Sequence, residues 1–321
     1  MKYISYDPTY TSLIPDYQVE QCQYEPYSPD YSNYVADYRI DIDFTTSASS
    51  IVPLFKYYGG KRKLLTYNAG IARFFVKCEN YVEPFIGAGA AYCYMSNNAM
   101  FKKAIINDND DDLVNLLIAI RDNCHEIVAC LTELLSTFPQ HADGEARRDH
   151  IHRLVEPYYT GKCSSIERSA LFYILRRNWF NGMHKGRSNN RGDLSGNGPQ
   201  SPANVQNLIN WKRALQNTEI TCSDYKSIAV PENAFVYVDP PYLATNKEYR
   251  DGYKHDFSNA EQMHCINWCR SISSVTVKVV LSNSNAETLH QYLAGFADIH
   301  EISVYYSSIR KHATEMLAVF K

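Results

Sequence analysis

From residue 51 onward, short apolar runs alternate with longer stretches that have helical periodicity. The apolar runs predict strands at Tyr81–Phe85, Ala104–Asn107, Phe235–Asp239, Val277–Ser282 and Met316–Phe320. The longer stretches predict helices at Asp111–Arg121, Ser165–Arg177 and Asn259–Ser271. Strands interleaved with helices predict an α/β sheet.

Two segments break this pattern. Residues 1–50 contain nine tyrosines among Pro, Asp and Ser with no sustained period, which predicts a tail without a core of its own. Residues 181–204 are rich in Gly, Asn, Arg and Ser and predict a long loop. Loops of that length are usually functional or disordered.

The charge is unevenly distributed along the 321 residues. A net charge of −3 and a pI near 6.4 by themselves argue against a nucleic-acid partner. However, residues 1–50 hold two bases and eight acids, whereas residues 141–215 hold twelve bases and six acids. The middle segment is therefore a candidate for contact with a polyanion, although a solvated helical face would have the same composition.

Composition also narrows the cellular setting. The nine cysteines are an odd number without a CxxC pair, which argues against a disulfide framework and against a zinc site. We therefore expect a reducing, intracellular compartment and no metal. No run approaches the roughly 18 apolar residues of a membrane span, and residues 1–15 do not read as a secretory signal, so no membrane partner is expected.

The first motif with chemical content runs from Tyr81 to Ala90, a predicted strand followed directly by a turn of small residues. Gly87 and Gly89 allow the backbone to approach a ligand that a Cβ atom would obstruct. Asp108 directly follows the second predicted strand, in the position that hydrogen-bonds ribose hydroxyls in dinucleotide-binding folds. The third glycine of GxGxxG is missing, which disfavours a nicotinamide cofactor.

The second motif, Asp239-Pro240-Pro241-Tyr242, closes the apolar run that begins at Phe235. Two consecutive prolines fix an extended turn and remove two backbone donors. The Asp239 carboxylate and a prolyl carbonyl are then acceptors beside an aromatic face, which suits an amine and a flat ring. A third motif, Phe55 to Lys61, is a glycine turn framed by aromatic residues and lysines, and alone it would be an ordinary basic turn.

Taken together and in this order, these motifs resemble the Dam-type (class D12, α-group) DNA adenine-N6 methyltransferases. The resemblance covers residues 54–321. It is strongest at Phe55–Leu65, Val82–Gly89, Ile106–Leu113, Arg176–Gly182, Asp239–Tyr242, Leu281–Asn283 and the closing Glu315-Met316-Leu317. It implies a Rossmann-like methyltransferase sheet with an inserted, mainly helical target-recognition domain. The implied catalytic domain is 51–140 and 216–321, and the implied recognition domain is 141–215.

The resemblance also implies a cofactor, S-adenosylmethionine, and roles for individual residues. Asp239, Pro240, Pro241 and Tyr242 match the catalytic motif, in which the carboxylate and the Pro240 carbonyl would orient an adenine amine and Tyr242 would stack on the base. The cofactor-binding positions are Tyr57, Lys61, Glu83, Phe85, Gly87, Gly89, Asp108 and Asp239. No metal is needed, because the sulfonium methyl group is already activated.

The implied partner is double-stranded DNA, from which the target adenine must be flipped out. Candidate DNA-binding residues lie in the basic loop, at Asn181, Lys185, Arg187 and Arg191. In members of the family that are specific for GATC, a hairpin in this position reads a guanine. The loop of this chain is about two residues longer than the hairpin of those members, so GATC is only one candidate for the recognised sequence. Methylation of RNA, of a small amine or of cytosine N4, and a catalytically inactive DNA-binding relative, remain alternatives, and the oligomeric state is open.

Overall fold

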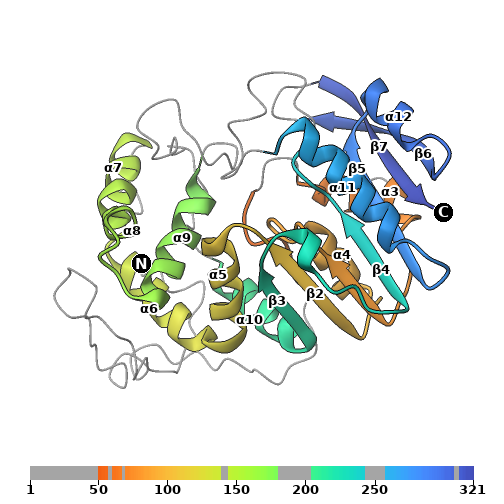
Figure 1. Ribbon diagram of the computed structural model, residues 1–321. Coiled ribbons are helices and arrows are strands. Elements are labelled where there is room, and N and C mark those ends of the chain that lie inside the picture. Colours follow the sequence, from red (N-terminus) through yellow and green to blue (C-terminus); the bar gives the residue numbers. More distant parts are fainter. Residues whose placement is uncertain are drawn as a thin grey trace. The chain divides into compact units, whose positions relative to one another are not determined.

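The computed structural model describes residues 50–56, 60–66, 69–138, 144–179, 204–242, 257–306 and 311–321. Its contacts divide the chain into two compact units, whose elements are labelled in Figure 1. One unit comprises Met1–Lys56 and Asp111–Gln216, and the other comprises Tyr57–Asp110 and Asn217–Lys321. We call them the helical unit and the sheet unit.

In the described part of the sheet unit, seven strands form one mixed sheet in the order β3-β2-β1-β4-β5-β7-β6. The five strands from β3 to β5 in this order are parallel, and β7 runs antiparallel to both β5 and β6. The strands are β1 (Asn80–Glu83), β2 (Lys103–Asp108), β3 (Thr218–Cys222), β4 (Ala234–Val238), β5 (Val277–Ser284), β6 (Ala297–Tyr306) and β7 (Lys311–Phe320). The predicted α/β, Rossmann-like class is confirmed.

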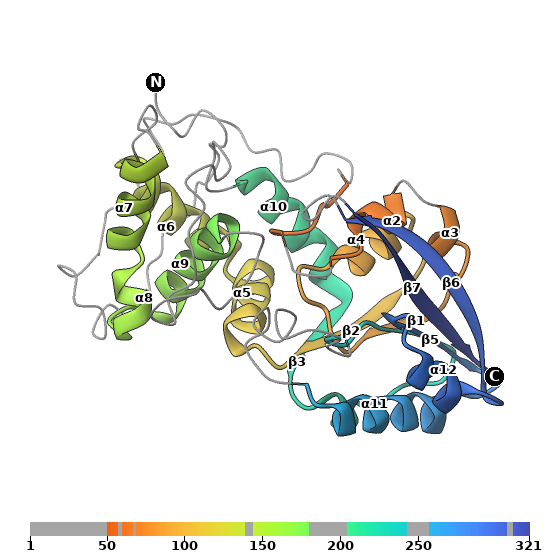
Figure 2. The ribbon, with the colours of Figure 1, turned by 90° about the horizontal axis from the view of Figure 1, so that it is seen from above.

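Helices cover both faces of this sheet, with α11 and α12 on one face and α2, α3 and α4 on the other (Figure 2). Their bounds are α2 (Arg62–Thr66), α3 (Ala69–Ala72), α4 (Ala90–Asn97), α11 (Asn259–Ile272) and α12 (Glu287–Leu293), and a 3₁₀ turn, η4 (Tyr225–Ser227), follows β3. The start of α11 is fixed by Ser258, whose hydroxyl accepts from the Glu261 N–H at 3.1 Å.

The two faces of the sheet are packed differently. The face that packs with α11 is mainly aliphatic, with Val236, Val279 and Leu281 among its fully buried residues. The other face is aromatic, where Phe75 packs on Phe235 and Tyr237 with ring centroids 5.4 and 4.9 Å apart. Every residue of β4 is buried, as expected for a central strand of a parallel sheet. Because β1, β2, β4 and β5 are parallel, their carboxyl ends meet at one edge, where ligands bind in such folds.

The helical unit contains six helices in its described part. They are α5 (Asp111–Asp122), α6 (Cys124–Ser136), α7 (Gly144–Leu154), α8 (Glu156–Thr160), α9 (Ser165–Asn178) and α10 (Val205–Ala214), followed by the 3₁₀ turn η3 (Leu215–Asn217). Ser164 caps α9 by accepting from the Glu167 N–H at 3.3 Å. None of the helices that the structure describes is long and apolar enough to cross a membrane.

One partly buried ion pair joins three elements of the helical unit. Arg168 of α9 donates to both carboxylate oxygens of Asp112, at 2.6 and 3.0 Å, and the Tyr158 hydroxyl of α8 donates to the same carboxylate at 2.7 Å. Asp112 stands in the first turn of α5, so its single side chain fixes α5 to α8 and α9. The second segment of this unit runs from Asp111 to Gln216 and includes the expected recognition domain, 141–215; that functional assignment stays a prediction.

Candidate active site

The glycine turn after β1 is held in place from β2. Gly87 and Gly89 have φ values of 48° and 78°, in the left-handed region that favours glycine, and Gly89 caps α4. The Asp108 carboxylate at the end of β2 accepts from the Gly87 N–H at 3.0 Å and from the Asp110 N–H at 3.1 Å. Asp108 and the turn, predicted separately from the sequence, therefore form one structural unit.

Asn107 fastens the neighbouring strand ends together. Its side-chain amide donates to the carbonyls of Pro84 and Ser223, each at 3.0 Å. Its amide oxygen accepts from the Thr221 hydroxyl at 2.8 Å and from the Ser223 N–H at 3.0 Å. The ends of β1, β2 and β3 are thereby fixed by one buried residue, which was not among the sequence-predicted site positions.

Two further predicted cofactor residues lie near this turn, in contrasting environments. Glu83 is buried and accepts from the Tyr81 hydroxyl at 2.7 Å, and burial raises the pKa of Glu83 well above its ordinary value. Phe85 is half-buried, with its ring centroid 5.2 Å from that of Tyr225 and 5.9 Å from that of Phe257. Tyr225 was missed by the sequence analysis, because β3, which precedes it, has few apolar residues.

The Asp-Pro-Pro-Tyr motif follows β4, and its carboxylate is held through one oxygen. The Asp239 Oδ1 atom lies 3.0 Å from the Lys61 ammonium and accepts from the Ser282 hydroxyl at 2.5 Å. Ser282 in turn accepts from the buried Tyr237 hydroxyl at 3.1 Å. Burial raises the pKa of Asp239 above its ordinary value, whereas the Lys61 ammonium and the Ser282 hydrogen bond oppose that rise.

Tyr242, the last residue of the motif, is joined to the strand β7. Its hydroxyl donates to Glu315 Oε2 at 2.7 Å, and the same oxygen lies 3.8 Å from the Lys61 ammonium. The Lys61 ammonium also lies 4.5 Å from the centroid of the Tyr242 ring. Lys61 thus contacts three side chains of the site, while only 3% of its own side chain is exposed.

A buried amide pair fixes the second proline of the motif. Gln262 of α11 donates to the Pro241 carbonyl and accepts from the Asn283 side-chain amide at 2.9 Å. Both amide residues are fully buried. The Pro241 carbonyl is thereby committed to the protein, so that Pro240 is the proline whose carbonyl suits an external donor.

The structure brings together Lys61, Asp239 and Tyr242, and it separately joins Asp108 to Gly87. Tyr57 and the predicted DNA-binding residues Asn181, Lys185, Arg187 and Arg191 lie outside the described residues. Sequence reasoning did not assign Ser282, Tyr237, Gln262 or Glu315 to the site. Ser282 and Glu315 belong to segments that were singled out, but their contacts depend on strand register, which no local pattern reveals.

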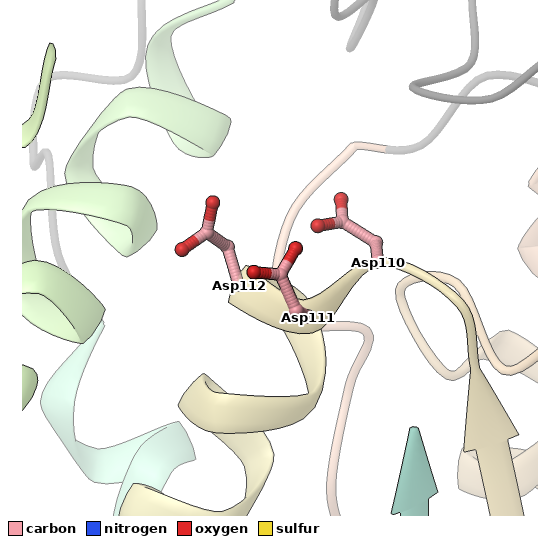
Figure 3. Close-up of side chains that lie close together, drawn as sticks. All are labelled: Asp110, Asp111 and Asp112. Atoms are coloured by element: carbon pink, nitrogen blue, oxygen red, sulfur yellow. The ribbon is translucent and has the colours of Figure 1, made fainter. Parts of the chain in front are cut away.

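Three consecutive acidic residues, Asp110, Asp111 and Asp112, lead into the first turn of α5 (Figure 3). Carboxylate oxygens are ligands for hard cations, but acidic side chains also stabilise a helix when they stand at its amino end. Asp112 is already engaged by Arg168 and Tyr158. The cluster is therefore accounted for without a cation, and the expectation of a metal-free enzyme stays a prediction.

Comparison with known proteins shows the family to which the sequence is similar. Type II methyltransferase M.MjaIII of Methanocaldococcus jannaschii is 29% identical over 262 residues, covering 77% of this chain and 89% of that relative. A DNA adenine methylase of Salmonella typhimurium is 27% identical over 278 residues, covering 83% of this chain and 94% of that relative. The solved structure of an rRNA methylase from Streptococcus thermophilus aligns with 79% of this chain and with 93% of its own chain, at 9% sequence identity. Its TM-score is 0.32, which is too low to support an argument.

The family model for D12 class N6 adenine-specific DNA methyltransferases matches residues 57–308. The match includes the glycine turn, Asp108 and the Asp-Pro-Pro-Tyr motif, and it confirms the resemblance found in the sequence. S-adenosylmethionine is the methyl donor in this family, and DNA is the substrate. The chain belongs to the D12 class of N6 adenine-specific DNA methyltransferases.

Proposed function

We propose that the chain methylates N6 of an adenine flipped out of a short, specific DNA sequence, with the Asp-Pro-Pro-Tyr motif as its catalytic centre. The observation that supports this most directly is the environment of Asp239. Its Oδ1 atom is held by Lys61 and Ser282 at 3.0 and 2.5 Å. With Oδ1 engaged, Oδ2 is the oxygen that accepts from an incoming amine.

An amine held in this way becomes a better nucleophile. The N6 lone pair of adenine is delocalised into the ring, so a hydrogen bond from N6 to Asp239 Oδ2 and another to the Pro240 carbonyl would orient it and raise its electron density. Preorganised acceptors of this kind can contribute several kcal/mol to the lowering of a barrier. Because both N6 hydrogens then donate to fixed acceptors, the orientation of the amine is fixed.

The glycine turn and Asp108 fit S-adenosylmethionine. Gly87 and Gly89 have positive φ values and no side chains, so the backbone of the turn after β1 can lie close to a bound cofactor. Asp108 lies at the end of the adjacent strand, where a ribose hydroxyl of the cofactor would donate to its carboxylate. When bound, the cofactor supplies a methyl group on a sulfonium sulfur. Tyr57, Lys61, Glu83, Phe85 and Asp239 complete the proposed cofactor contacts.

The experiment that tests this proposal compares Asp239→Ala with a matched control, Asp298→Ala. Asp298 is 61% exposed and pairs with Lys321 at 2.9 Å, away from the motif. Methyl transfer should fall by orders of magnitude in Asp239→Ala and stay unchanged in the control, while both variants stay folded at the assay temperature. Near-normal turnover in Asp239→Ala would refute the assignment.

The modified base and the sequence are settled by a second experiment. DNA from cells expressing the protein is sequenced by a method that detects both N6-methyladenine and N4-methylcytosine. We expect N6-methyladenine at one short sequence, with GATC as one candidate. Methylation confined to cytosine or to RNA, or no methylation at all, would favour the corresponding alternative.

We further propose that residues 141–215 recognise the DNA, with Lys185 or Arg187 reading a guanine; this segment holds twelve bases against six acids. A guanidinium or ammonium group fits guanine O6 and N7, and losing such a contact costs about 1–3 kcal/mol at one base pair. Arg153→Ala, an exposed position on α7, is the matched control for general electrostatics. If Lys185→Ala and Arg187→Ala weaken binding to every sequence equally, the residue that recognises the guanine lies elsewhere.

A DNA substrate also implies an intracellular enzyme.

A further inference from the structure

The Tyr242 side chain is fixed at two points. The phenol hydroxyl donates to Glu315 Oε2 at 2.7 Å, and the Lys61 ammonium lies 4.5 Å from the ring centroid. A cation at that distance occupies one face of an aromatic ring. A flat base can therefore stack on the opposite face, and the orientation of that face depends on where the hydroxyl is anchored.

Glu315 is well suited to be that anchor, because it is buried within the sheet. Only 6% of its side chain is exposed, and it lies in β7, paired with Ser284 of β5 on one side and with Ile302 of β6 on the other. The anchor is thus built into the sheet, whereas Tyr242 stands beyond the end of β4 in a segment without regular structure.

We propose that Glu315 is a positioning residue for the target adenine: by accepting a hydrogen bond from the phenol it fixes the Tyr242 ring at the angle on which the flipped base stacks. This rests on the proposed function, in which Tyr242 is the stacking surface. Glu315 does not touch the base or the cofactor in this role. Its contribution is the hydrogen bond to Tyr242, and its charge is secondary.

The role of the hydrogen bond separates from that of the charge in two variants. Glu315→Gln removes the charge but keeps an oxygen that accepts from the phenol, whereas Glu315→Ala removes both. We expect Glu315→Ala to lower kcat/KM about ten- to a hundredfold, the range that loss of base stacking spans. Glu315→Gln should stay within about threefold of the wild type, and the affinity for S-adenosylmethionine should hold in both. Glu301→Ala, an exposed acid on the adjacent strand β6, is the control.

A direct readout of stacking uses a duplex with 2-aminopurine at the methylated position, once that sequence is known. The fluorescence of this base rises when it leaves the helix and is quenched when it stacks on an aromatic ring. Glu315→Ala and Tyr242→Phe should both brighten the bound duplex, and the double variant should be no brighter than either, because both changes break the same hydrogen bond.

Two outcomes would overturn the proposal. One is that Glu315→Gln loses as much activity as Glu315→Ala, which would assign the effect to charge. The other is that the effects of Glu315→Ala and Tyr242→Phe add. A failure of the underlying function looks different: in that case Tyr242→Ala, which removes the whole ring, also leaves the fluorescence and the rate unchanged.

Discussion

Replacing Lys61 by methionine removes the positive charge that faces both carboxylates of the site. At an effective dielectric constant of about 20, two unit charges at the observed Lys61–Asp239 separation of 3.0 Å attract by about 5 kcal/mol. That energy corresponds to about 4 pH units of pKa, at about 1.4 kcal/mol per unit. The Lys61 ammonium also interacts with Glu315, and 19% of the Asp239 side chain is exposed, so the full value is not reached. We therefore expect the pKa of Asp239 to rise by about 1–3 pH units in Lys61→Met.

The sign of the effect on activity follows from the protonation state that the reaction needs. Asp239 must be ionised to accept a hydrogen bond from the adenine amine, and burial already raises its pKa above 3.8 while Lys61 opposes the rise. Activity is therefore lost as the pH falls through the pKa of Asp239 in the folded protein. Without the ammonium that pKa is higher, so Lys61→Met should lose activity at a higher pH than the wild type.

The assay is kcat measured as a function of pH, with Lys102→Met as the control. Lys102 is 76% exposed and lies 3.5 Å from Glu79, so its replacement should leave the profile unchanged. The acid limb of Lys61→Met should move upward by about 1–3 pH units. An acid limb that stays in place or moves to lower pH would refute the view that Lys61 keeps Asp239 ionised.

Three further predictions test other contacts. Ser282→Ala removes a donor from Asp239, and loss of a hydrogen bond to a charged group, about 1.5–3 kcal/mol, should lower kcat about ten- to a hundredfold in steady-state assays, with unchanged affinity for the cofactor. Asp108→Ala frees the Gly87 N–H and removes the proposed ribose contact, so calorimetry should find S-adenosylmethionine bound about ten- to a hundredfold more weakly; an unchanged Kd would remove Asp108 from the cofactor site. Asp112→Ala leaves Arg168 without its carboxylate; because the Arg168 side chain is 37% exposed, urea denaturation should give about 1–3 kcal/mol less stability, whereas a loss below about 0.5 kcal/mol would show that the ion pair is dispensable.

The sheet was largely predictable where its strands are buried on both faces. All residues of β4 are apolar and buried, so an uninterrupted run marked it in the sequence. β3 was not predicted, because it pairs with β2 alone at the edge of the sheet and only Thr218 of its five residues is buried. β6, at the other edge, was also missed, because His300 and Glu301 interrupt its apolar positions.

The catalytic motif was predictable as a motif, but its surroundings were not. Asp239 and Lys61 could be named from the sequence because each lies in a short pattern with an unusual composition. The Ser282 contact follows from the parallel register that pairs Val238 with Leu281, which sets the next residues of the two strands side by side. Glu315 reaches Tyr242 because the last strand inserts antiparallel to β5, and no local pattern encodes that order of strands.

The position of β7 also constrains when activity can arise during synthesis. The Lys61 ammonium meets Asp239 and Glu315, so the catalytic side chains are contributed by an early, a middle and a late part of the chain. A ribosome must release β7 before the Tyr242 hydroxyl has its acceptor. Until then Lys61 faces a single carboxylate, and a nascent chain that stops short of this strand would hold the complete Asp-Pro-Pro-Tyr motif without the group that anchors its tyrosine. Methylating activity should therefore arise only after β7 has paired with β5 in the sheet. Chains truncated before β7 should be inactive even where the rest has folded.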